Sequence, residues 1–537
     1  MKILSRGIRL PLAALSGLLA GFAALTVAEL VSAAVRPESG PVIAVGGASI
    51  DRTPPALKDW AIRHFGTNDK LVLQLGILAV LALFALALGV LALRFRRSGA
   101  AGVLLFGLVG ALAATSRPDS TSAADALPSV VGAVAGAGLL YFLIGRLTLG
   151  AGSPTAAPDK DVEVSKTGDG EGSPGWDRRG FVIAAGAAAA ASSGAGLLGR
   201  SLNASRGQGA VASRAKVSLP NPASPAKPVP PGAVLHTPGI SPFVTPNADF
   251  YRVDTALVIP KVDATSWRMK IHGKGVGRPL ELTFQDLLGR RLIERDITLT
   301  CVSNEVGGPY VGNARWIGVP LADLLKEAGV KPPSRGGPAD QLVARSVDGM
   351  TIGTPVEDIM DGRDAMLAVG MNGEPLPFVH GFPVRMVVPG LYGYVSACKW
   401  LQDLELTTFD SYDSYWVKRS WARKAPIKTE SRIDTPKPFA RPKPGTVMIA
   451  GAAWAQHRGI DRVEVRVDDG AWTRADLATE DTTDTWRQWS LPWKATSGAH
   501  TLTVRATDRT GQVQTEQRTQ TIPDGASGWH SVVVTVD

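Results

Sequence analysis

The apolar residues of this chain are crowded into its first 200 positions, and this crowding restricts the possible folds more than any other feature. Four long apolar runs occupy residues 10–34, 71–93, 99–115 and 127–147. A helix needs about 20 apolar residues to cross the core of a bilayer. The second and fourth runs meet this length comfortably, and the third is short. The sequence therefore predicts an all-α transmembrane bundle of four spans over residues 1–148.

A fifth apolar run, at residues 176–200, differs from the others in composition. It is rich in Ala and Gly, and Arg178 and Arg179 open it in the sequence RRGFVI. A twin arginine before a mildly apolar stretch resembles a Tat export signal, here internal, and Tat carries proteins that fold before export. Two arginines also serve as a plain cytoplasmic anchor for a fifth transmembrane segment. Both interpretations give the same topology.

Basic residues at the ends of the runs predict how the chain crosses the membrane. Three clusters flank the runs: Lys2, Arg6 and Arg9; Arg94, Arg96 and Arg97; Arg178 and Arg179. Positively charged loops stay on the cytoplasmic side. Five crossings place all three clusters there and leave residues after 200 outside, although loop 35–70 then carries five basic residues externally. We expect a multi-pass protein of the cell membrane with its soluble half extracytoplasmic.

The predicted spans carry no haem ligands. None of the seven histidines lies inside a span, and a haem-bearing bundle needs axial ligands of this kind. The helices are then left to anchor the chain, to bind a partner or to contact a quinone, and the sequence does not choose among these.

Beyond the membrane half, the composition and the hydrophobic pattern of the sequence change several times. Residues 149–175 are rich in Gly, Ser, Pro and Asp and predict a cytoplasmic linker, and the Pro-rich residues 201–246 predict an extracytoplasmic linker or arm. Residues 247–428 mix short β-rich runs with helical spacing, which indicates an α+β domain. Residues 429–537 alternate with period two between regular turns, which is typical of an immunoglobulin-like β-sandwich.

Charge and cysteine content exclude two classes of protein. The net charge is +9, yet no basic stripe carries interleaved aromatic residues, and much of the excess flanks apolar helices. We therefore expect no nucleic-acid partner. The chain has only two cysteines, far apart in sequence, which do not make a disulfide framework.

One of these cysteines, Cys301, has an unusual setting. It ends the alternating run DITLT at residues 296–300, and the polar, glycine-containing loop 302–308 follows at once. A lone cysteine is most often a small buried hydrophobe. A thiolate displayed beside such a loop is also suited to a soft metal. The local sequence leaves both interpretations open.

The motifs that follow Cys301 together resemble those of one family. They are GNARWIGVPLADLL at 312–325, MNGEPLP at 371–377, HGFPVR at 380–385 and PGLYGYVSACKWL at 389–401. In this order they resemble the sulfite oxidase family of molybdopterin enzymes, over roughly residues 247–537. The resemblance implies a Mo-molybdopterin cofactor and oxygen-atom transfer on a sulfite-type or sulfoxide-type small molecule. It also implies that the C-terminal sandwich is a dimerisation domain, so a homodimer is expected.

The resemblance assigns roles to individual residues. Cys301 would be the thiolate ligand of molybdenum, and Arg315 and Glu305 would lie near it as further catalytic candidates. The remaining candidates would hold the pterin and its phosphate: Tyr251, Arg252, His380, Arg385, Ser396 and Lys399. Guanidinium groups suit such phosphates because they bind them in a bidentate manner. Each residue has a plainer alternative, such as a structural ion pair for either arginine near the site or a turn position for His380.

The chain also departs from the family pattern. Sulfite oxidases usually carry Arg-Asn-His where this chain has Asp254-Thr255-Ala256, and arginines often follow the cysteine where residues 302–306 have none. Fewer cations near the metal weaken the case for a dianion such as sulfite. Glu305 would then contact a neutral or cationic substrate, relay protons, or be an ordinary loop carboxylate.

Two other functions compete with an outward-facing enzyme that uses a separate electron carrier. One is a non-catalytic surface receptor built on a degenerate cofactor domain. The other is a redox subunit linked to quinone through its helices. No CxxCH haem motif occurs in the chain, so electrons must pass to a carrier or to a quinone in either enzymatic case.

Overall fold

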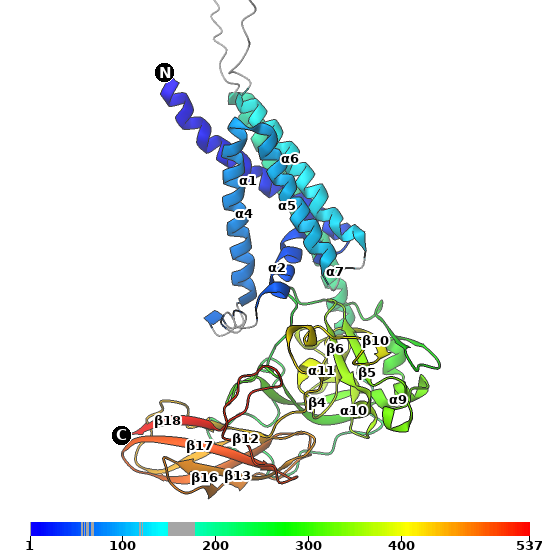
Figure 1. Ribbon diagram of the computed structural model, residues 1–537, viewed down its shortest axis with the longest axis vertical. Coiled ribbons are helices and arrows are strands. Elements are labelled where there is room, and N and C mark those ends of the chain that lie inside the picture. Colours follow the sequence, from blue (N-terminus) through cyan, green and yellow to red (C-terminus); the bar gives the residue numbers. More distant parts are fainter. Residues whose placement is uncertain are drawn as a thin grey trace, which may run out of the picture. The chain divides into compact units, whose positions relative to one another are not determined.

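The computed structural model describes residues 2–54, 69–117, 122–148 and 178–537, together with residues 57, 60, 64, 65 and 120. The predicted cytoplasmic linker, residues 149–175, lies outside the described residues. The chain divides into two compact units, drawn in Figure 1. The helical unit comprises residues 1–208 and 255–258, and the second unit comprises residues 209–254 and 259–537.

The first unit is built from apolar helices, as predicted. They are α1 (Lys2–Ala34), α2 (Pro41–Arg52), α4 (Asp69–Arg94), α5 (Arg96–Ser116), α6 (Leu127–Thr148) and α7 (Arg178–Ala215). Five segments are long and apolar enough to cross a membrane: Ile8–Ala34, Lys70–Arg94, Arg96–Ser116, Ala123–Thr148 and Arg179–Ala215. Helix α7 continues past residue 200, because the chain has no helix-breaking proline between residue 178 and Pro220.

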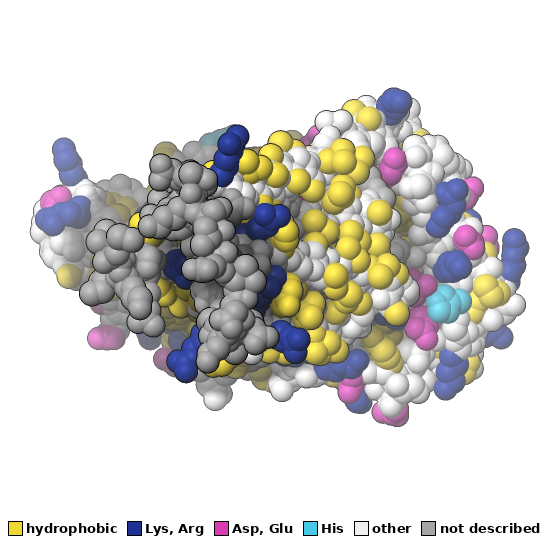
Figure 2. All heavy atoms as spheres, turned by 90° about the horizontal axis from the view of Figure 1, so that it is seen from above, with side chains coloured by type: hydrophobic (Ala, Val, Ile, Leu, Met, Phe, Trp, Pro, Cys, Tyr) yellow, Lys and Arg dark blue, Asp and Glu magenta, His cyan; other side chains and the backbone are white. Residues whose placement is uncertain are grey.

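These helices expose large apolar side chains and pack through small ones. Leu83 and Leu105 are 66% and 59% exposed, and Figure 2 shows hydrophobic side chains gathered in a band across the middle of the view. A Cβ added at Gly17 or Gly89 would collide with the backbone of the facing helix. Glycine therefore allows α1 and α4 to approach closely, as in membrane bundles. The N-terminal end of α1, the α4–α5 turn and the start of α7 lie at one end of the helices (Figure 1).

The second unit begins with two β-sheets flanked by short helices. One sheet has the order β2-β1-β10-β5-β6 and the other β3-β4-β7-β8, with β9 paired to β7. The strands are β1 (Arg268–Gly273), β2 (Leu280–Thr283), β3 (Ile293–Thr300), β4 (Val311–Pro320), β5 (Gln341–Ser346), β6 (Thr351–Pro355), β7 (Met366–Met371), β8 (Glu374–Pro375), β9 (Arg385–Val387) and β10 (Leu401–Thr407). The helices are α8 (Phe284–Leu288), α9 (Leu321–Glu327), α10 (Val356–Met360) and α11 (Gly393–Ser396). The predicted α+β class is confirmed.

The C-terminal part is a sandwich of two four-stranded sheets, β11-β12-β16-β15 and β14-β13-β17-β18. The strands are β11 (Glu430–Thr435), β12 (Gly445–Trp454), β13 (Ile460–Val467), β14 (Thr473–Arg474), β15 (Asp476–Leu477), β16 (Arg487–Ala495), β17 (Gly498–Asp508) and β18 (His530–Val536). Inward residues such as Ile449, Trp489 and Val504 form its core. The period-two alternation therefore gave the correct fold, because each sheet buries one face.

The Pro-rich segment after α7 is an ordered arm on the second unit. Its backbone amides at Ala223 and Thr245 donate to Leu292 O (2.9 Å) and Asn313 O (2.8 Å). The amide of Leu235 donates to Gln488 Oε1 (2.7 Å) in the sandwich. The arm thus holds the two parts of this unit together.

Candidate active site

Cys301 lies directly after the last residue of β3, where a short loop is closed by hydrogen bonds. Its amide donates to Tyr310 O (2.9 Å), and the Asn304 amide donates to Cys301 O (3.0 Å). Asn304 Oδ1 accepts from the Tyr310 amide (2.8 Å). The thiol is buried and unoxidised. Burial raises its pKa, whereas hydrogen bonds from Ser303 and the charge of Lys399 lower it. The loop thus holds one buried sulfur near a cation.

The HGFPVR segment supplies a buried histidine and a buried arginine. His380 ends a 3-10 turn, Phe378–His380, and its Nε2 lies 2.9 Å from Asn247 O. Burial, together with the charges of Arg385, Lys399 and Arg252, lowers its pKa to about 4, so the ring is neutral at ordinary pH. Arg385 opens β9, donates through Nη1 to His380 O (3.2 Å) and lies 5.0 Å from the ring centre of Trp316.

Arg385 is a buried cation without a counter-ion. It is 5% exposed, no ion pair joins it to another residue in the described ranges, and its Nε has no hydrogen-bond partner there. Burial lowers its pKa to about 10. An uncompensated buried charge is costly unless something else supplies the missing acceptor. The site is therefore built for an anionic group with several acceptor oxygens.

Lys399 and Arg252 meet at one carboxylate, Asp254. Lys399 Nζ donates to Asp254 Oδ2 (2.8 Å) and to Val379 O (3.2 Å). Arg252 Nε donates to Asp254 Oδ2 (2.8 Å). The Asp254 side chain is only 1% exposed. Burial lowers the pKa of Lys399 to about 8, against the opposing effect of Asp254. The acid that departs from the family pattern thus pairs with two cations of the site and offsets one of their two positive charges.

Tyr251 completes the group. Burial raises its pKa, as does the nearby charge of Cys301, while Arg385 lowers it. Its ring stacks on Phe250 with centres 5.1 Å apart. The structure therefore brings together six of the predicted residues, whose charges affect one another's pKa values. They are Cys301, Tyr251, Arg252, His380, Arg385 and Lys399.

Three predicted residues do not join this group. Arg315 makes a bidentate ion pair with Asp296 (2.9 and 2.6 Å), on the face of β4 opposite to Trp316. The Ser396 hydroxyl donates to the main-chain carbonyls of Leu391 and Tyr392 (2.9 and 3.1 Å). The side chain of Glu305 is exposed.

Two buried acids were missed by the motif analysis. Glu430, on β11 of the sandwich, is 4% exposed, and burial raises its pKa to about 8 although bonds with Asn304 and Tyr392 lower it. Asp348, in the β5–β6 turn, has a raised pKa because of burial, with Asp254 adding to the effect. Neither lies in a motif, so only the fold could reveal them.

The sandwich supports the Cys301 loop directly. Gly307 has a φ of 76° and any side chain there would collide with the ring of His530. Arg432 Nη1 donates to Gly308 O (2.8 Å), and the Trp486 amide donates to Thr298 Oγ1 (2.8 Å) on β3. The geometry of the thiol therefore depends on both parts of the second unit.

This support predicts acid sensitivity. Burial and the charge of Arg432 lower the pKa of His530 from 6.5 to about 4, and its Nδ1 accepts from the Ile433 amide (3.0 Å). Since the unfolded chain binds the proton more readily, the contribution of neutral His530 is complete above pH 6.5 and is lost as pH falls toward 4. Between pH 7 and 4, the free energy of unfolding should therefore fall by about 1–3 kcal/mol less in His530→Gln than in the parent. Thermal unfolding of the full chain in detergent between pH 7 and 4 measures it. The exposed His236→Gln variant should follow the parent, and an unchanged pH profile in His530→Gln would contradict the argument.

The buried thiol, the neutral histidine and the unpaired guanidinium fit a pterin cofactor that bears a phosphate and a thiol-ligated metal. Comparison with known proteins agrees. Residues 256–416 match the oxidoreductase molybdopterin binding domain, and residues 426–537 match the Mo-co oxidoreductase dimerisation domain. The fold and site thus define a molybdopterin oxidoreductase.

Relatives narrow this class. Mitochondrial sulfite oxidase of Mus musculus is 31% identical over 293 residues, 46% of this chain and 53% of the relative. Sulfite oxidase of Gallus gallus is 30% identical over 318 residues, 51% of this chain and 68% of the relative. The chain belongs to the sulfite oxidase family of molybdopterin-dependent oxidoreductases. Its similarity spans about half the length of the mammalian relatives. The solved sulfane dehydrogenase SoxCD from Paracoccus pantotrophus is 27% identical, with 55% of this chain and 84% of that chain covered and a TM-score of 0.47.

Proposed function

We propose that this chain is a membrane-anchored, extracytoplasmic enzyme that transfers an oxygen atom to or from a small sulfur compound. The observation that carries the proposal is the buried Cys301 thiol set among a neutral histidine and an unpaired buried arginine. A non-catalytic receptor would have no use for an uncompensated charge at Arg385, which costs stability unless a ligand balances it.

Each residue of the site has a role in this proposal. Cys301 binds molybdenum as a thiolate, and Arg385 and Lys399 bind the cofactor's phosphate. Neutral His380 hydrogen-bonds the pterin, with Tyr251 and Arg252 along its edge. When bound, molybdopterin supplies two-electron oxygen-atom transfer, and the protein positions the substrate against it. We assign Arg315 and Ser396 to supporting the fold around the site, and Glu305 to its rim.

The membrane topology is part of the proposal. Five helices are long and apolar enough to cross a bilayer. The three basic clusters fall in segments at one end of these helices (Figure 1), which supports a cytoplasmic position for that end. An odd number of crossings then leaves residues after 215 extracytoplasmic. Cysteine labelling from outside the cell at an engineered exposed site, such as Ser420→Cys, tests the side directly.

We further propose the domain boundaries 247–428 and 429–537, a homodimer through the C-terminal sandwich, and a Tat-like role for RRGFVI. The matches at residues 256–416 and 426–537 support the boundaries and the dimer. Size measurement of the purified full chain in detergent, corrected for bound detergent, distinguishes monomer from dimer. Mutation of Arg178 and Arg179 to lysine tests whether export depends on the twin arginine.

For the substrate, we propose a neutral sulfoxide rather than sulfite, and the position of Asp254 supports this choice. Asp254 occupies two of the cations that would otherwise attract a dianion. A dye-linked assay in both directions separates the two classes: oxidation of sulfite and reduction of methyl phenyl sulfoxide. Purified protein without molybdenum, or without activity on either compound, would contradict the proposed function.

The role of Asp254 can be tested by removing its charge. In Asp254→Asn, the site gains one unit of net positive charge while Lys399 and Arg252 stay in place, so it attracts a dianionic substrate more strongly. We expect kcat/KM for sulfite relative to the sulfoxide to rise about tenfold, and inhibition by sulfate to strengthen similarly. Asp364→Asn, which removes an exposed partner of Arg295, is the control and should leave both ratios unchanged. An unchanged ratio in Asp254→Asn would show that this carboxylate does not set specificity.

A further inference from the structure

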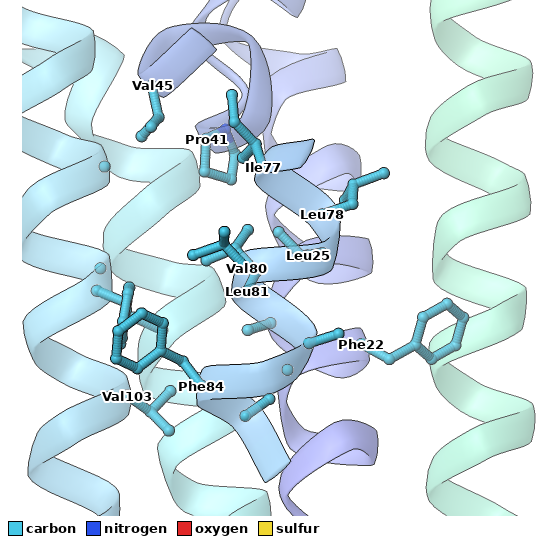
Figure 3. A pocket seen from close by; sticks show the side chains of 18 of the residues that line it. Phe22, Leu25, Pro41, Val45, Ile77, Leu78, Val80, Leu81, Phe84 and Val103 are labelled. Atoms are coloured by element: carbon cyan, nitrogen blue, oxygen red, sulfur yellow. The ribbon is translucent and has the colours of Figure 1, made fainter. Parts of the chain in front are cut away.

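The helical unit contains a large apolar cavity. It has a volume of about 720 Å³, within the range of small-molecule sites. Residues of α1, α2, α4, α5 and α6 line it. Figure 3 labels Leu25 of α1, Pro41 and Val45 of α2, Ile77 of α4 and Val103 of α5 among them. Gly76 leaves part of this space open, since a Cβ added there would have no atom within 4 Å.

Among the described residues that line the cavity, Ser129, near the start of α6, is the one with a polar side chain. Ser129 is 3% exposed, lines the cavity, and its Oγ has no hydrogen-bond partner among the described residues. Other hydroxyls in these helices behave differently, because Ser16 and Thr26 donate to the carbonyls of Leu12 (2.8 Å) and Phe22 (3.0 Å) four residues earlier. A buried hydroxyl without a partner is costly in an apolar medium. It therefore points to a ligand with an acceptor oxygen.

The cavity opens on the outside of the helices. Phe22, Val80 and Phe84 line it and are 45%, 50% and 50% exposed. Ser129 lies one helical turn from Asp125, a buried carboxylate paired with Arg36 (3.0 Å). Because ion pairs lie near the ends of membrane helices rather than at their centre, the polar end of the cavity lies toward a membrane surface. A molecule with an apolar tail and a polar ring can enter from the lipid.

We propose that this cavity binds a membrane quinone, with a ring carbonyl accepting a hydrogen bond from Ser129. The choice of a redox lipid rests on the proposed function. Oxidising a substrate with oxygen from water releases two electrons and two protons, and reducing a quinone to a quinol consumes two of each. In the reducing direction the quinol returns them and the sulfoxide oxygen leaves as water.

Binding can be measured without turnover. The full chain is purified in detergent, its co-purified lipids are identified by mass spectrometry, and it is titrated with decylubiquinone. We expect quinone to co-purify with the parent. Gly76→Leu fills the cavity and should weaken decylubiquinone binding at least about tenfold. Its control is Gly138→Leu, which places the same side chain in open space on α6 away from the cavity and should bind within twofold of the parent.

Ser129→Ala provides a second test that keeps the fold intact. Loss of one neutral hydrogen bond should weaken binding about two- to tenfold, whereas Ser32→Ala, whose hydroxyl donates to Glu29 O (2.8 Å), should not. Phospholipid alone in the purified protein, or equal binding by Gly76→Leu and Gly138→Leu, would overturn the assignment. Dye-linked activity is measured on the same samples, so a failure of quinone binding is distinguished from a failure of the proposed enzyme.

Discussion

Replacing Cys301 with serine is expected to lower dye-linked oxygen-atom-transfer activity by at least about 100-fold, since even loss of a residue behind a metal ligand costs 10- to 100-fold. An alcohol is a far poorer ligand than a thiolate for a metal in a sulfur-rich environment. The substitution leaves Arg385, Lys399 and His380 in place, which we propose hold the pterin, so we expect pterin to remain while molybdenum content falls. Metal analysis and pterin fluorescence of the same preparation measure the two quantities separately.

The second cysteine provides a matched control. Cys398 is buried like Cys301, and within the described ranges its thiol donates a hydrogen bond to the main-chain oxygen of Lys399 (3.7 Å). Cys398→Ala should cost stability through lost packing and leave molybdenum content unchanged. Full metal and activity in Cys301→Ser, or equal losses in both variants, would show that Cys301 is not the ligand.

The sequence predicted the fold well wherever a hydrophobic period controls it. Spans longer than a bilayer core and strands that alternate with period two have few alternatives, so the helical unit and the sandwich were both expected. The sequence did not predict the end of α7 at residue 215. An Ala-rich helix continues until a proline stops it, and no sequence signal marks the point where the helix would leave the membrane. The sequence predicted a linker where the structure has an ordered arm. Its order could not be predicted, because its hydrogen bonds go to residues that are distant in sequence.

The site was predicted by motif and refined by side-chain direction. Arg315 and Trp316 are neighbours in GNARW, yet only Trp316 faces Arg385, because consecutive residues of a strand point to opposite sides. The register of β3 and β4 sets Arg315 beside Asp296, and sequence alone does not give this register. Glu430 comes from another domain, so no local pattern could place it near the loop of Cys301. By contrast, the sequence already showed Asp254 as a departure from the family pattern. The structure explains this acid, because its carboxylate accepts hydrogen bonds from Arg252 and Lys399.

Replacing Arg385 with methionine is expected to have opposite effects on the apoprotein and on cofactor loading. In protein from a host unable to make molybdopterin, Arg385 is a buried charge with no ion-pair partner among the described residues, and its low pKa of about 10 reflects that burial. Methionine removes the charge and keeps most of the volume, so we expect the apoprotein to gain about 1–4 kcal/mol in its free energy of unfolding. In a host that makes the cofactor, the variant should lose most of its bound pterin, because the phosphate loses its bidentate partner.

Arg432 provides the matched control for this prediction. It is buried to a similar degree, but Asp434 pairs with it at 2.7 Å. Arg432→Met leaves that carboxylate buried and unpaired, which should destabilise the protein by about 3–5 kcal/mol. Unfolding by urea is measured for both variants from the host without molybdopterin, and pterin content is measured for both variants from the host that makes it. If Arg385→Met destabilised the apoprotein as Arg432→Met does, or retained full pterin, Arg385 would be a structural residue and the anionic cofactor would have to be held elsewhere. A gain in apoprotein stability together with loss of pterin is the combination that only a residue reserved for the cofactor produces.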